Sequence, residues 1–426
     1  MARVPRPGRP THRGSRSASP AGPAPACENR SVPLHDAPVT ALGHPPTPRC
    51  EQVLARVRAF LDGLELPAQP DPFSLDLDLK RRVQEASAAA GLYCPHLPEA
   101  DGGLGLSLVE TFWVQHEVYR RGIGGGQWML AWTDGPSPLV SAWGPEAREQ
   151  HLAPFLAGTT TVAFALTEPG VGSDFPSLTT TARRDGDGYV LDGEKHLITG
   201  APSAELAQVF ARLEGAPRGH LTAFLVPLNA PGVERGPVQQ TIMGDGLTGG
   251  LRFSGVRVPA AMRLGDEGSA IGLAFRWINW ARSRRGGMCT GLARHCLELS
   301  VAYAHERESF GKPIAEHGAV GGMLANMAMD VEALQALSLE LLARLDRNPG
   351  FLTGGPVSAG DRRDLSILKT WCDEALYRVA DTAIQVHGGR GLLTETGIER
   401  IFRVARNLRI PAGTTEIQRD LIARAL

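Results

Sequence analysis

The chain has 426 residues, which is long enough for two or three domains that each bury a core. Its 44 Lys and Arg residues balance 45 Asp and Glu residues, so a formal net charge of −1 gives it no electrostatic reason to bind nucleic acid or a membrane surface. Six cysteines are scattered without the spacing of a metal site or a disulfide framework, and no apolar run approaches the roughly 18 residues of a membrane span. We therefore expect a cytoplasmic protein with reduced thiols and no metal.

Residues 1–50 are rich in Pro, Arg, Ala, Ser and Gly and show no apolar periodicity. Such a segment buries too little apolar surface to offset the loss of chain entropy, so the composition predicts a disordered tail. No apolar core of a signal peptide is present in it. Three interpretations stay open: a flexible tail, an organelle-type leader, or a start codon assigned too far upstream.

From residue 51 the apolar residues recur at three- and four-residue steps, as at Val53, Val57 and Leu61. This is the spacing of an amphipathic helix. Residues 51–160 are therefore predicted to form an all-helical N-terminal domain. Further helices of this domain are expected over residues 79–90, 108–119 and 145–156.

Residues 161–265 alternate apolar and polar positions between Asp-Gly and Pro-Gly turns, a pattern that predicts a middle β-domain. Residues 266–426 return to long helical patterns joined by short loops, which predicts a helical bundle. The fold class is thus α+β, with a helical N-terminal domain, a central β-domain and a C-terminal bundle. The bundle helices are expected over residues 271–307, 320–345, 363–387 and 395–409.

One stretch in the β-region leads from a strand into a polar turn. Residues 164–177 read FALTEPGVGSDFPS, which puts hydroxyl and backbone N–H groups at the end of a strand. That arrangement suits a flat, polar ligand with phosphate groups, although such a turn alone is usually only a turn. Four further segments accompany it: GEKHLIT at 193–199, RESFGKP at 307–313, QVHGGRGL at 385–392 and AGTTEIQR at 412–419.

In this order and at this spacing, the five segments resemble the acyl-CoA dehydrogenase family of flavoproteins, from roughly residue 56 to the C-terminus. The resemblance implies an FAD-dependent dehydrogenase that desaturates the CH–CH group of an acyl thioester, either acyl-CoA or carrier-bound acyl. It implies FAD between the two later domains and a homodimer or homotetramer. An electron-transfer flavoprotein or oxygen would accept the electrons.

The resemblance also implies which residues contact FAD. Thr167 and Ser173 would hold the flavin ring and the substrate's pantetheine arm, and Thr199 would lie near flavin N5. Leu197 stands where the family carries a large aromatic residue, which would leave the flavin face more open. The full set of implied FAD contacts is Phe164, Leu166, Thr167, Ser173, Leu197, Thr199, Arg307, Phe310, Gln385, Gly388, Gly389, Thr414 and Glu416.

Arg307 and Phe310 match residues that reach the FAD diphosphate and adenine from a neighbouring subunit, where a guanidinium is the expected partner. Gly388 and Gly389 lack a Cβ and would let the backbone approach the cofactor. His387, in the same run, is expected only to pack or to bond to backbone. The implied substrate contacts are Ser173, Arg282, Ala412 and Gly413.

This chain departs from the family pattern at its catalytic base. The family usually has a Glu before the Gly-Thr of the last motif, and here that position is Ala412; a second lineage places its Glu at the position of Ala281. No Asp or Glu occurs at positions 268–297 or 400–415. The catalytic residue is therefore unknown, with Arg282 and Asp245 as candidates for a role in catalysis.

Three functional interpretations follow from the resemblance. The first is an acyl thioester dehydrogenase whose base comes from an unusual position or a partner chain. The second is a flavin oxidase or monooxygenase on the same scaffold, which needs no base for the α-proton and which Leu197 favours. The third is a subunit without a base that completes the FAD site of a paralogue in a mixed oligomer.

Overall fold

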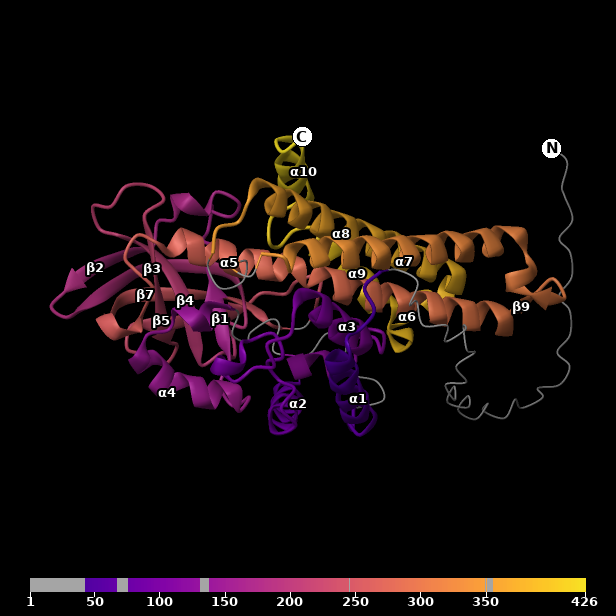
Figure 1. Ribbon diagram of the computed structural model, residues 1–426, viewed down its shortest axis with the longest axis horizontal. Coiled ribbons are helices and arrows are strands. Elements are labelled where there is room, and N and C mark those ends of the chain that lie inside the picture. Colours follow the sequence, from indigo (N-terminus) through magenta and orange to yellow (C-terminus); the bar gives the residue numbers. More distant parts are fainter. Residues whose placement is uncertain (1–42, 67–75, 131–137, 245, 349, 351–354) are drawn as a thin grey trace, which may run out of the picture. The chain divides into compact units, whose positions relative to one another are not determined.

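The computed structural model describes residues 43–66, 76–130, 138–244, 246–348, 350 and 355–426. Helices open this part of the chain, a sheet follows, and long helices close it (Figure 1). This order confirms the predicted α+β fold class. Among the described helices, none combines the length and the hydrophobicity that crossing a bilayer requires.

The first helices begin at residues that satisfy their free backbone N–H groups. Thr47 accepts a hydrogen bond from the Cys50 N–H, and Pro48 stands at the first helical position, where its missing N–H is harmless. Ser107 and Glu110 form a reciprocal capping box. The four α-helices of this region are α1 (Pro48–Asp62), α2 (Leu77–Ala89), α3 (Leu108–Tyr119) and α4 (Pro145–Leu156).

The start of α1 differs from the sequence-based boundary. Residues 48–50 are helical, although the predicted tail extends to residue 50. The Thr47 hydroxyl also donates to Glu110 Oε1 at 2.6 Å, so α3 already holds the chain at this point. Thr47 and Pro48 together form a helix-start signal. The composition of residues 1–50 as a whole does not reveal this local signal.

The central region forms one sheet of eight strands. The strand order is β6-β7-β3-β2-β4-β5-β8, with β1 paired in parallel to β4, β2 also parallel to β4, and the other pairs antiparallel. Gly186 makes the tight turn between β2 and β3, with a φ of 62°. The strands are β1 (Val162–Ala165), β2 (Thr181–Asp185), β3 (Gly188–Thr199), β4 (Leu206–Leu213), β5 (Leu221–Pro227), β6 (Val233–Val238), β7 (Thr248–Pro259) and β8 (Arg263–Leu264).

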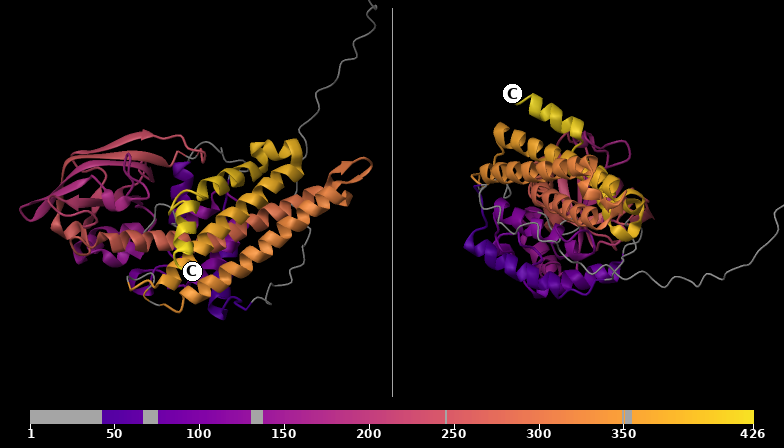
Figure 2. Two further views of the ribbon diagram at one scale, coloured as in Figure 1. Left: turned by 90° about the horizontal axis from the view of Figure 1, so that it is seen from above. Right: turned by 90° about the vertical axis from the view of Figure 1, so that its right-hand side faces the viewer.

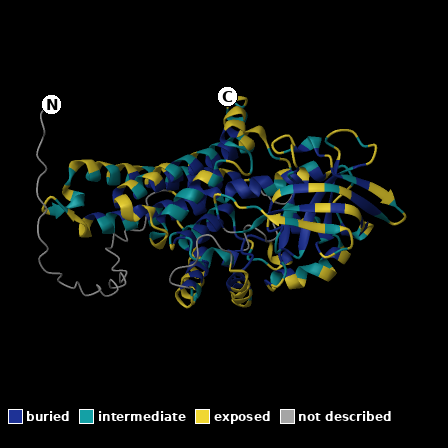
Figure 3. Ribbon diagram, turned by 180° about the vertical axis from the view of Figure 1, so that it is seen from behind, coloured by how far each residue is buried: buried dark blue, intermediate teal, exposed yellow. Residues whose placement is uncertain are grey.

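Long helices form the C-terminal region, where α6, α7 and α8 pack against one another and α3 packs against α6 (Figure 2). A Cβ on Gly287 of α6 would collide with the Phe112 carbonyl of α3, so glycine is required at this crossing. Buried residues lie on the inner faces of these helices (Figure 3). The elements are α5 (Ala270–Ser283), α6 (Arg285–Glu306), β9 (Glu308–Ser309), β10 (Lys312–Pro313), α7 (Gly318–Leu345), α8 (Ala359–His387), α9 (Ile398–Leu408) and α10 (Thr415–Ala423).

The sequence predicts one helix over residues 271–307, whereas the structure has two. α5 ends at Ser283 and α6 begins at Arg285. The Ser283 hydroxyl donates back to the Trp280 carbonyl at 2.9 Å, a bond of the kind that bends helices. Arg284 keeps helical dihedral angles between them, with a φ of −70° and a ψ of −7°. The apolar periodicity therefore runs through the junction and does not reveal it.

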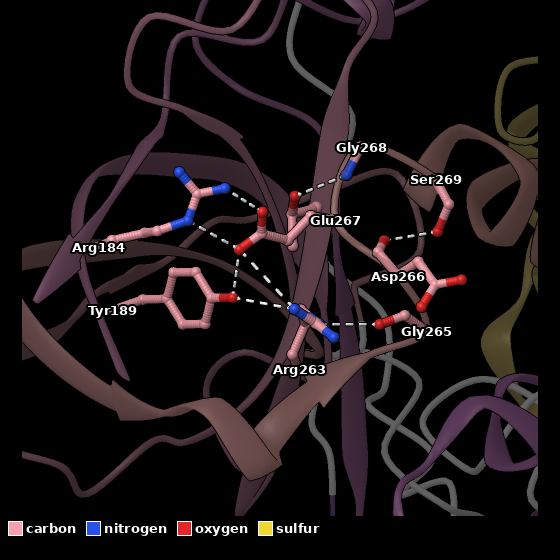
Figure 4. Close-up of polar contacts among 9 residues, drawn as sticks. Arg184, Tyr189, Arg263, Gly265, Asp266, Glu267, Gly268 and Ser269 are labelled. Carbon is pink, nitrogen blue, oxygen red and sulfur yellow. Dashed lines mark hydrogen bonds and ion pairs between the residues drawn. The ribbon is translucent and has the colours of Figure 1, made fainter. Parts of the chain in front are cut away.

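Glu267 fixes the connection that leads from the sheet into α5. Its carboxylate accepts hydrogen bonds from Tyr189 at 2.5 Å and from Arg184 at 3.1 Å, and it lies 3.7 Å from Arg263 (Figure 4). Arg184 and Tyr189 belong to β2 and β3, so one carboxylate joins two strands to this connection. The helix therefore starts from a fixed point on the sheet.

A buried ion pair anchors the loop after β1. Lys195 Nζ lies 2.8 Å from Glu168 Oε1, and both side chains are almost completely buried. Burial alone would raise the pKa of Glu168, but the charge of Lys195 and hydrogen bonds from Lys195, Thr179 and Thr180 outweigh it and lower that pKa to about 2. Burial lowers the pKa of Lys195 to about 8 against the opposing effect of Glu168. Near neutral pH both groups are charged.

We expect Glu168→Gln to lower the free energy of unfolding by roughly 3 to 5 kcal/mol near pH 6, because it leaves Lys195 buried without its counter-charge. The folded-state pKa of Glu168 is about 2 against 4.5 for a free carboxyl, so its stabilising contribution is complete above about pH 4.5 and is lost as the pH falls toward 2. Chemical denaturation across this range measures the effect. The matched control is Glu194→Gln, at an exposed carboxylate of β3. A deficit that stays constant with pH would contradict the pairing.

Candidate functional site

The loop that follows β1 carries Thr167 and Ser173. Glu168 and Val171 exchange two backbone hydrogen bonds of 3.0 Å, which close a tight turn. The Thr167 carbonyl accepts from the His196 N–H at 2.9 Å, so the loop is joined to β3. Thr167 is half-buried and Ser173 is exposed. The loop therefore holds its hydroxyl groups at the end of a strand with one side open.

The end of β3 does not follow the regular pairing of the sheet. The pairing of β3 with β7 shifts register between Lys195 and Ile198, as in a β-bulge. Leu197 lies within this irregularity with a φ of 54°, and 53% of it is exposed. Thr199, at the end of the strand, is exposed too. The bulge thus directs two of the predicted FAD contacts away from the core.

Three non-glycine residues of the described chain have a positive φ, and all three are predicted site residues. They are Leu197 with 54°, Phe310 with 52° and Ala412 with 61°. Such backbone conformations cost about 1 to 3 kcal/mol each and persist where the surrounding structure enforces them, most often at functional sites. The strain therefore marks the same positions as the sequence motifs.

The segment around Ala412 is held by a buried guanidinium. Arg282 Nε donates to the Ala412 carbonyl at 2.9 Å, and only 5% of Arg282 is exposed. Burial lowers the pKa of Arg282 to about 10. A Cβ on Gly413, whose φ is 93°, would collide with Gln418 and lie 3.1 Å from Arg282 Nη2. Thr414 caps α10 by accepting from the Ile417 N–H at 3.4 Å.

Ala412 and Ala281, the two positions that the sequence resemblance matches to a catalytic base, lie at the same apolar cluster. Ala281 is 3% exposed and lies in this cluster beside Trp280, and the partly buried Ala412 packs against it. Ala412 also contacts the core of the sheet region, as does Trp277, which stacks on Phe164 with ring centroids 4.1 Å apart. The structure therefore brings both positions together in apolar surroundings next to Arg282.

A second group of predicted residues lies at the far end of α6 and α8. Arg307 follows α6, and Phe310 at the tip of the β9–β10 hairpin is 97% exposed. Gly388 ends α8 with a φ of 58°, and a Cβ there or on Gly389 would meet nothing within 4 Å. Gln385 is exposed on the last turn of α8. These residues form an open surface of backbone, amide and guanidinium groups.

The two groups are not brought together within one chain. α6 has 22 residues, so about 33 Å of helix separates Arg285, next to the first group, from Arg307. Figure 1 shows β9 at the opposite end of α6 from α5. The stacking of His387 on Tyr303, with centroids 4.5 Å apart, fixes the end of α8 beside the end of α6.

The remaining predicted residues are placed as follows. The side chain of Leu166 is buried in the core of the sheet region, and its carbonyl accepts from Lys195 Nζ at 3.2 Å. Glu416 is exposed in the first turn of α10. His387 Nδ1 bonds to the Ala383 carbonyl at 2.8 Å, the packing role that the sequence predicts. Asp245 lies outside the described residues.

A buried charge cluster beside Arg282 is not predicted by any motif. Asp373 of α8 lies 2.9 Å from Lys369 Nζ and 3.5 Å from Arg285 Nε. All three side chains are at most 5% exposed. Burial raises the pKa of Asp373, and the two cations oppose that rise. Lys369 is one of only four lysines and occupies a core-facing helical position, which is the one signal in the sequence that could have drawn attention to it.

Family models match almost the whole of the chain that the structure describes. They are the N-terminal, middle and C-terminal domains of acyl-CoA dehydrogenase, at residues 47–159, 163–256 and 271–426 respectively. The three matches follow one another in the order of the helical, sheet and bundle regions.

Individual relatives agree with the family models. The chain is 32% identical to cyclohex-1-ene-1-carbonyl-CoA dehydrogenase of Geobacter metallireducens, over 83% of this chain and 93% of that protein. It is also 32% identical to the caffeyl-CoA reductase-Etf complex subunit CarC of Acetobacterium woodii, over 68% and 74%. Acyl-CoA dehydrogenase of Bacillus anthracis, solved in complex with FAD, superposes with a TM-score of 0.76 at 28% identity, over 88% of this chain and 66% of that one.

The fold, the order of the motifs and these matches lead to one assignment. The sheet region and the bundle both carry the family's motifs, and the family models account for residues on both sides of the site. The chain belongs to the acyl-CoA dehydrogenase family, and it is an FAD-dependent oxidoreductase that dehydrogenates acyl thioesters.

Proposed function

We propose that this protein is an acyl thioester dehydrogenase that has no side-chain base at either position known in the family. The apolar packing of Ala412 and Ala281 next to the buried Arg282 is the observation that carries the proposal. A methyl group cannot accept a proton, so the activation of the substrate falls to main-chain and cationic groups.

The residues present fit FAD. Thr167, Ser173 and Thr199 offer hydroxyl groups to a flavin ring, and the open backbone at Gly388 leaves room for close approach. The exposed guanidinium of Arg307 suits a diphosphate. Bound FAD supplies the oxidant that takes up a hydride from the substrate's β-carbon. We assign the other predicted FAD contacts on the same basis, with Leu166 acting through its backbone.

The main chain at Ala412 and Gly413 would hold the thioester. Within the described residues, neither of their N–H groups donates a hydrogen bond to another part of the chain. Two adjacent N–H groups that are fixed in position stabilise negative charge on a carbonyl oxygen, as in an oxyanion hole. Arg282 keeps them in place by binding the Ala412 carbonyl. This residue pair therefore acidifies the α-carbon without removing its proton.

We further propose that the working unit is a homodimer or homotetramer, with a mixed oligomer with a paralogue as the alternative. The separation of Arg307 and Phe310 from the residues near Arg282 supports it, because a second copy can bring the exposed hairpin to the flavin of the first. The domain boundaries 51–160, 161–265 and 266–426 belong to the same proposal. The buried free cysteines at positions 50, 94, 289, 296 and 372 support a cytoplasmic location.

The electron acceptor is proposed to be an electron-transfer flavoprotein. The name of the CarC relative, which belongs to a complex with such a protein, supports this. The exposed Leu197 supports oxygen as the alternative, because a leucine covers less of a flavin face than a large aromatic residue does.

Arg307→Ala should weaken FAD retention at least tenfold, because the diphosphate loses a charged partner. The FAD content of purified protein, read from its flavin absorbance after dialysis, measures this. Arg347→Ala, at an exposed arginine after α7, is the control and should retain FAD. Wild-type protein that is colourless and cannot be reconstituted with FAD would refute the cofactor assignment.

The protein with FAD bound should scatter light as a dimer or tetramer. Arg307→Ala should lower the FAD content and leave the oligomer intact. Phe310→Ser, at the exposed hairpin tip, should lower the FAD content and weaken the association of the subunits. Multi-angle light scattering on both variants and on the wild type measures the mass. A monodisperse monomer that still retains FAD would contradict a shared site.

Ala412→Glu should speed flavin reduction by straight-chain acyl thioesters by about 10² to 10⁴, the usual contribution of a general base. Anaerobic stopped-flow bleaching of the flavin with butyryl-coenzyme A measures the rate. Ala412→Gly is the matched control, because it relieves the positive φ without adding a carboxylate. If wild type already bleaches at the rate of the Glu variant, another base is present, and Asp245→Asn is the first variant to test for it.

A further inference from the structure

Among the described residues, the interior beside Ala412 carries more positive than negative charge. Arg282, Arg285 and Lys369 are each at most 5% exposed, and Asp373 is the carboxylate that pairs with the last two. Among the described residues, no carboxylate lies within 4 Å of Arg282, which bonds to the Ala412 carbonyl and, at 3.5 Å, to Asn279. The neighbouring pair of Arg409 and Glu374, at 2.9 Å, is neutral in sum and does not change the balance.

Three buried cations with one carboxylate among them lower the stability of the folded protein. A buried charge is tolerated when a counter-charge or several hydrogen bonds accompany it. In the part of the chain that the structure describes, Asp373 serves both Lys369 and Arg285, and Arg282 has no carboxylate partner. The cations also act on each other: burial lowers the pKa of Lys369, the charge and hydrogen bond of Asp373 oppose this, and the charges of Arg285 and Arg282 add smaller decreases. The charge balance would improve if an anion entered from outside the protein.

The place for such an anion lies next to residue 412. Ala412 has only a methyl group where the sequence resemblance places a glutamate, so the side chain of residue 412 occupies less space beside the substrate's α-carbon than a glutamate would. Arg282 Nη2 lies beside Gly413, 3.1 Å from the position that a Cβ on that residue would take. A carboxylate on the substrate would restore the charge that the side chain at 412 does not provide.

We propose that the substrate is an acyl thioester with a carboxylate on its α-carbon, a malonyl-type thioester, and that Arg282 binds that carboxylate. The inference rests on the proposed function, which places the thioester carbonyl at the Ala412 and Gly413 N–H groups. It names the substrate class that a site without a base can oxidise.

The reaction of such a substrate needs no base. The bond between the α-carbon and the carboxylate breaks, CO₂ leaves, and the electron pair of that bond forms the Cα=Cβ double bond as a hydride leaves the β-carbon for the flavin. No proton is removed at any step. The main-chain N–H groups of residues 412 and 413 stabilise charge on the thioester oxygen meanwhile. Arg282 pairs with the carboxylate before it is lost, so its effect falls on binding more than on the chemical step.

Binding is tested with two thioesters that cannot be dehydrogenated because they have no β-hydrogen. The protein with FAD bound should bind malonyl-coenzyme A roughly 10- to 100-fold more tightly than acetyl-coenzyme A, as measured by calorimetry. Equal affinity for the two would overturn the proposal.

Variants attribute this preference to named residues. Arg282→Met should remove the preference for malonyl-coenzyme A, Arg282→Lys should keep part of it, and Arg347→Met, at an exposed arginine, should keep all of it. Ala412→Glu should also abolish it, because its carboxylate takes the same space and repels the ligand. If Arg282→Met fails to fold, Ala412→Glu still decides, and an unchanged preference in that variant would overturn the proposal.

Turnover is tested with a matched pair of thioesters that do have a β-hydrogen. Ethylmalonyl-coenzyme A should bleach the flavin at least 100-fold faster than butyryl-coenzyme A and release one CO₂ per flavin reduced, and Arg282→Lys should raise KM more than it lowers kcat. Equal rates, or bleaching without CO₂, would overturn the proposal but leave the proposed function intact. A protein that retains no FAD would instead overturn the proposed function, and this is seen before any thioester is added.

Discussion

The hydrogen bond from Arg282 to the Ala412 carbonyl is the contact on which the site depends. It joins the end of α5 to the segment before α10, two elements that are 130 residues apart in the chain. Gln418 supports the same segment from α10, with its amide 3.4 Å from the Ala412 carbonyl. Because these contacts are buried or half-buried, they can hold Ala412 and Gly413 in left-handed conformations that the segment would not adopt alone. The two main-chain N–H groups are oriented as a result.

Contacts of the sheet region also hold the site in place. Glu168 and Lys195 tie the loop after β1 to β3, and Glu267 fixes the start of α5 against β2 and β3. α5 therefore connects a rigid anchor on the sheet to Arg282 at its last turn. A helix held at one end by a charge network and at the other by a buried guanidinium has little freedom to move the site.

The sequence was sufficient for the fold and for the local motifs, and insufficient for contacts between distant segments. Periodicity locates the long helices because the apolar faces of α7 and α8 are regular, and turn residues locate the strands. Periodicity does not reveal the division between α5 and α6, because the apolar pattern continues through Ser283 and Arg284 although the helix ends there. The local sequence pattern does not predict the cluster of Asp373, Lys369 and Arg285 either. These charges come together only because α6 packs against α8. The separation of Arg307 from Arg282 follows only from the length of α6.

The balance of buried charges limits which ligands the site around Arg282 can bind. A buried arginine that has no carboxylate partner lowers the stability of the folded protein unless something compensates its charge. The compensation is not found in the described part of this chain, where Asp373 is already shared by Lys369 and Arg285. Arg282 nevertheless stays deeply buried rather than turning toward solvent. The hydrogen bond to the Ala412 carbonyl holds Arg282 there, so its positive charge stays beside residue 412 and favours an anionic ligand.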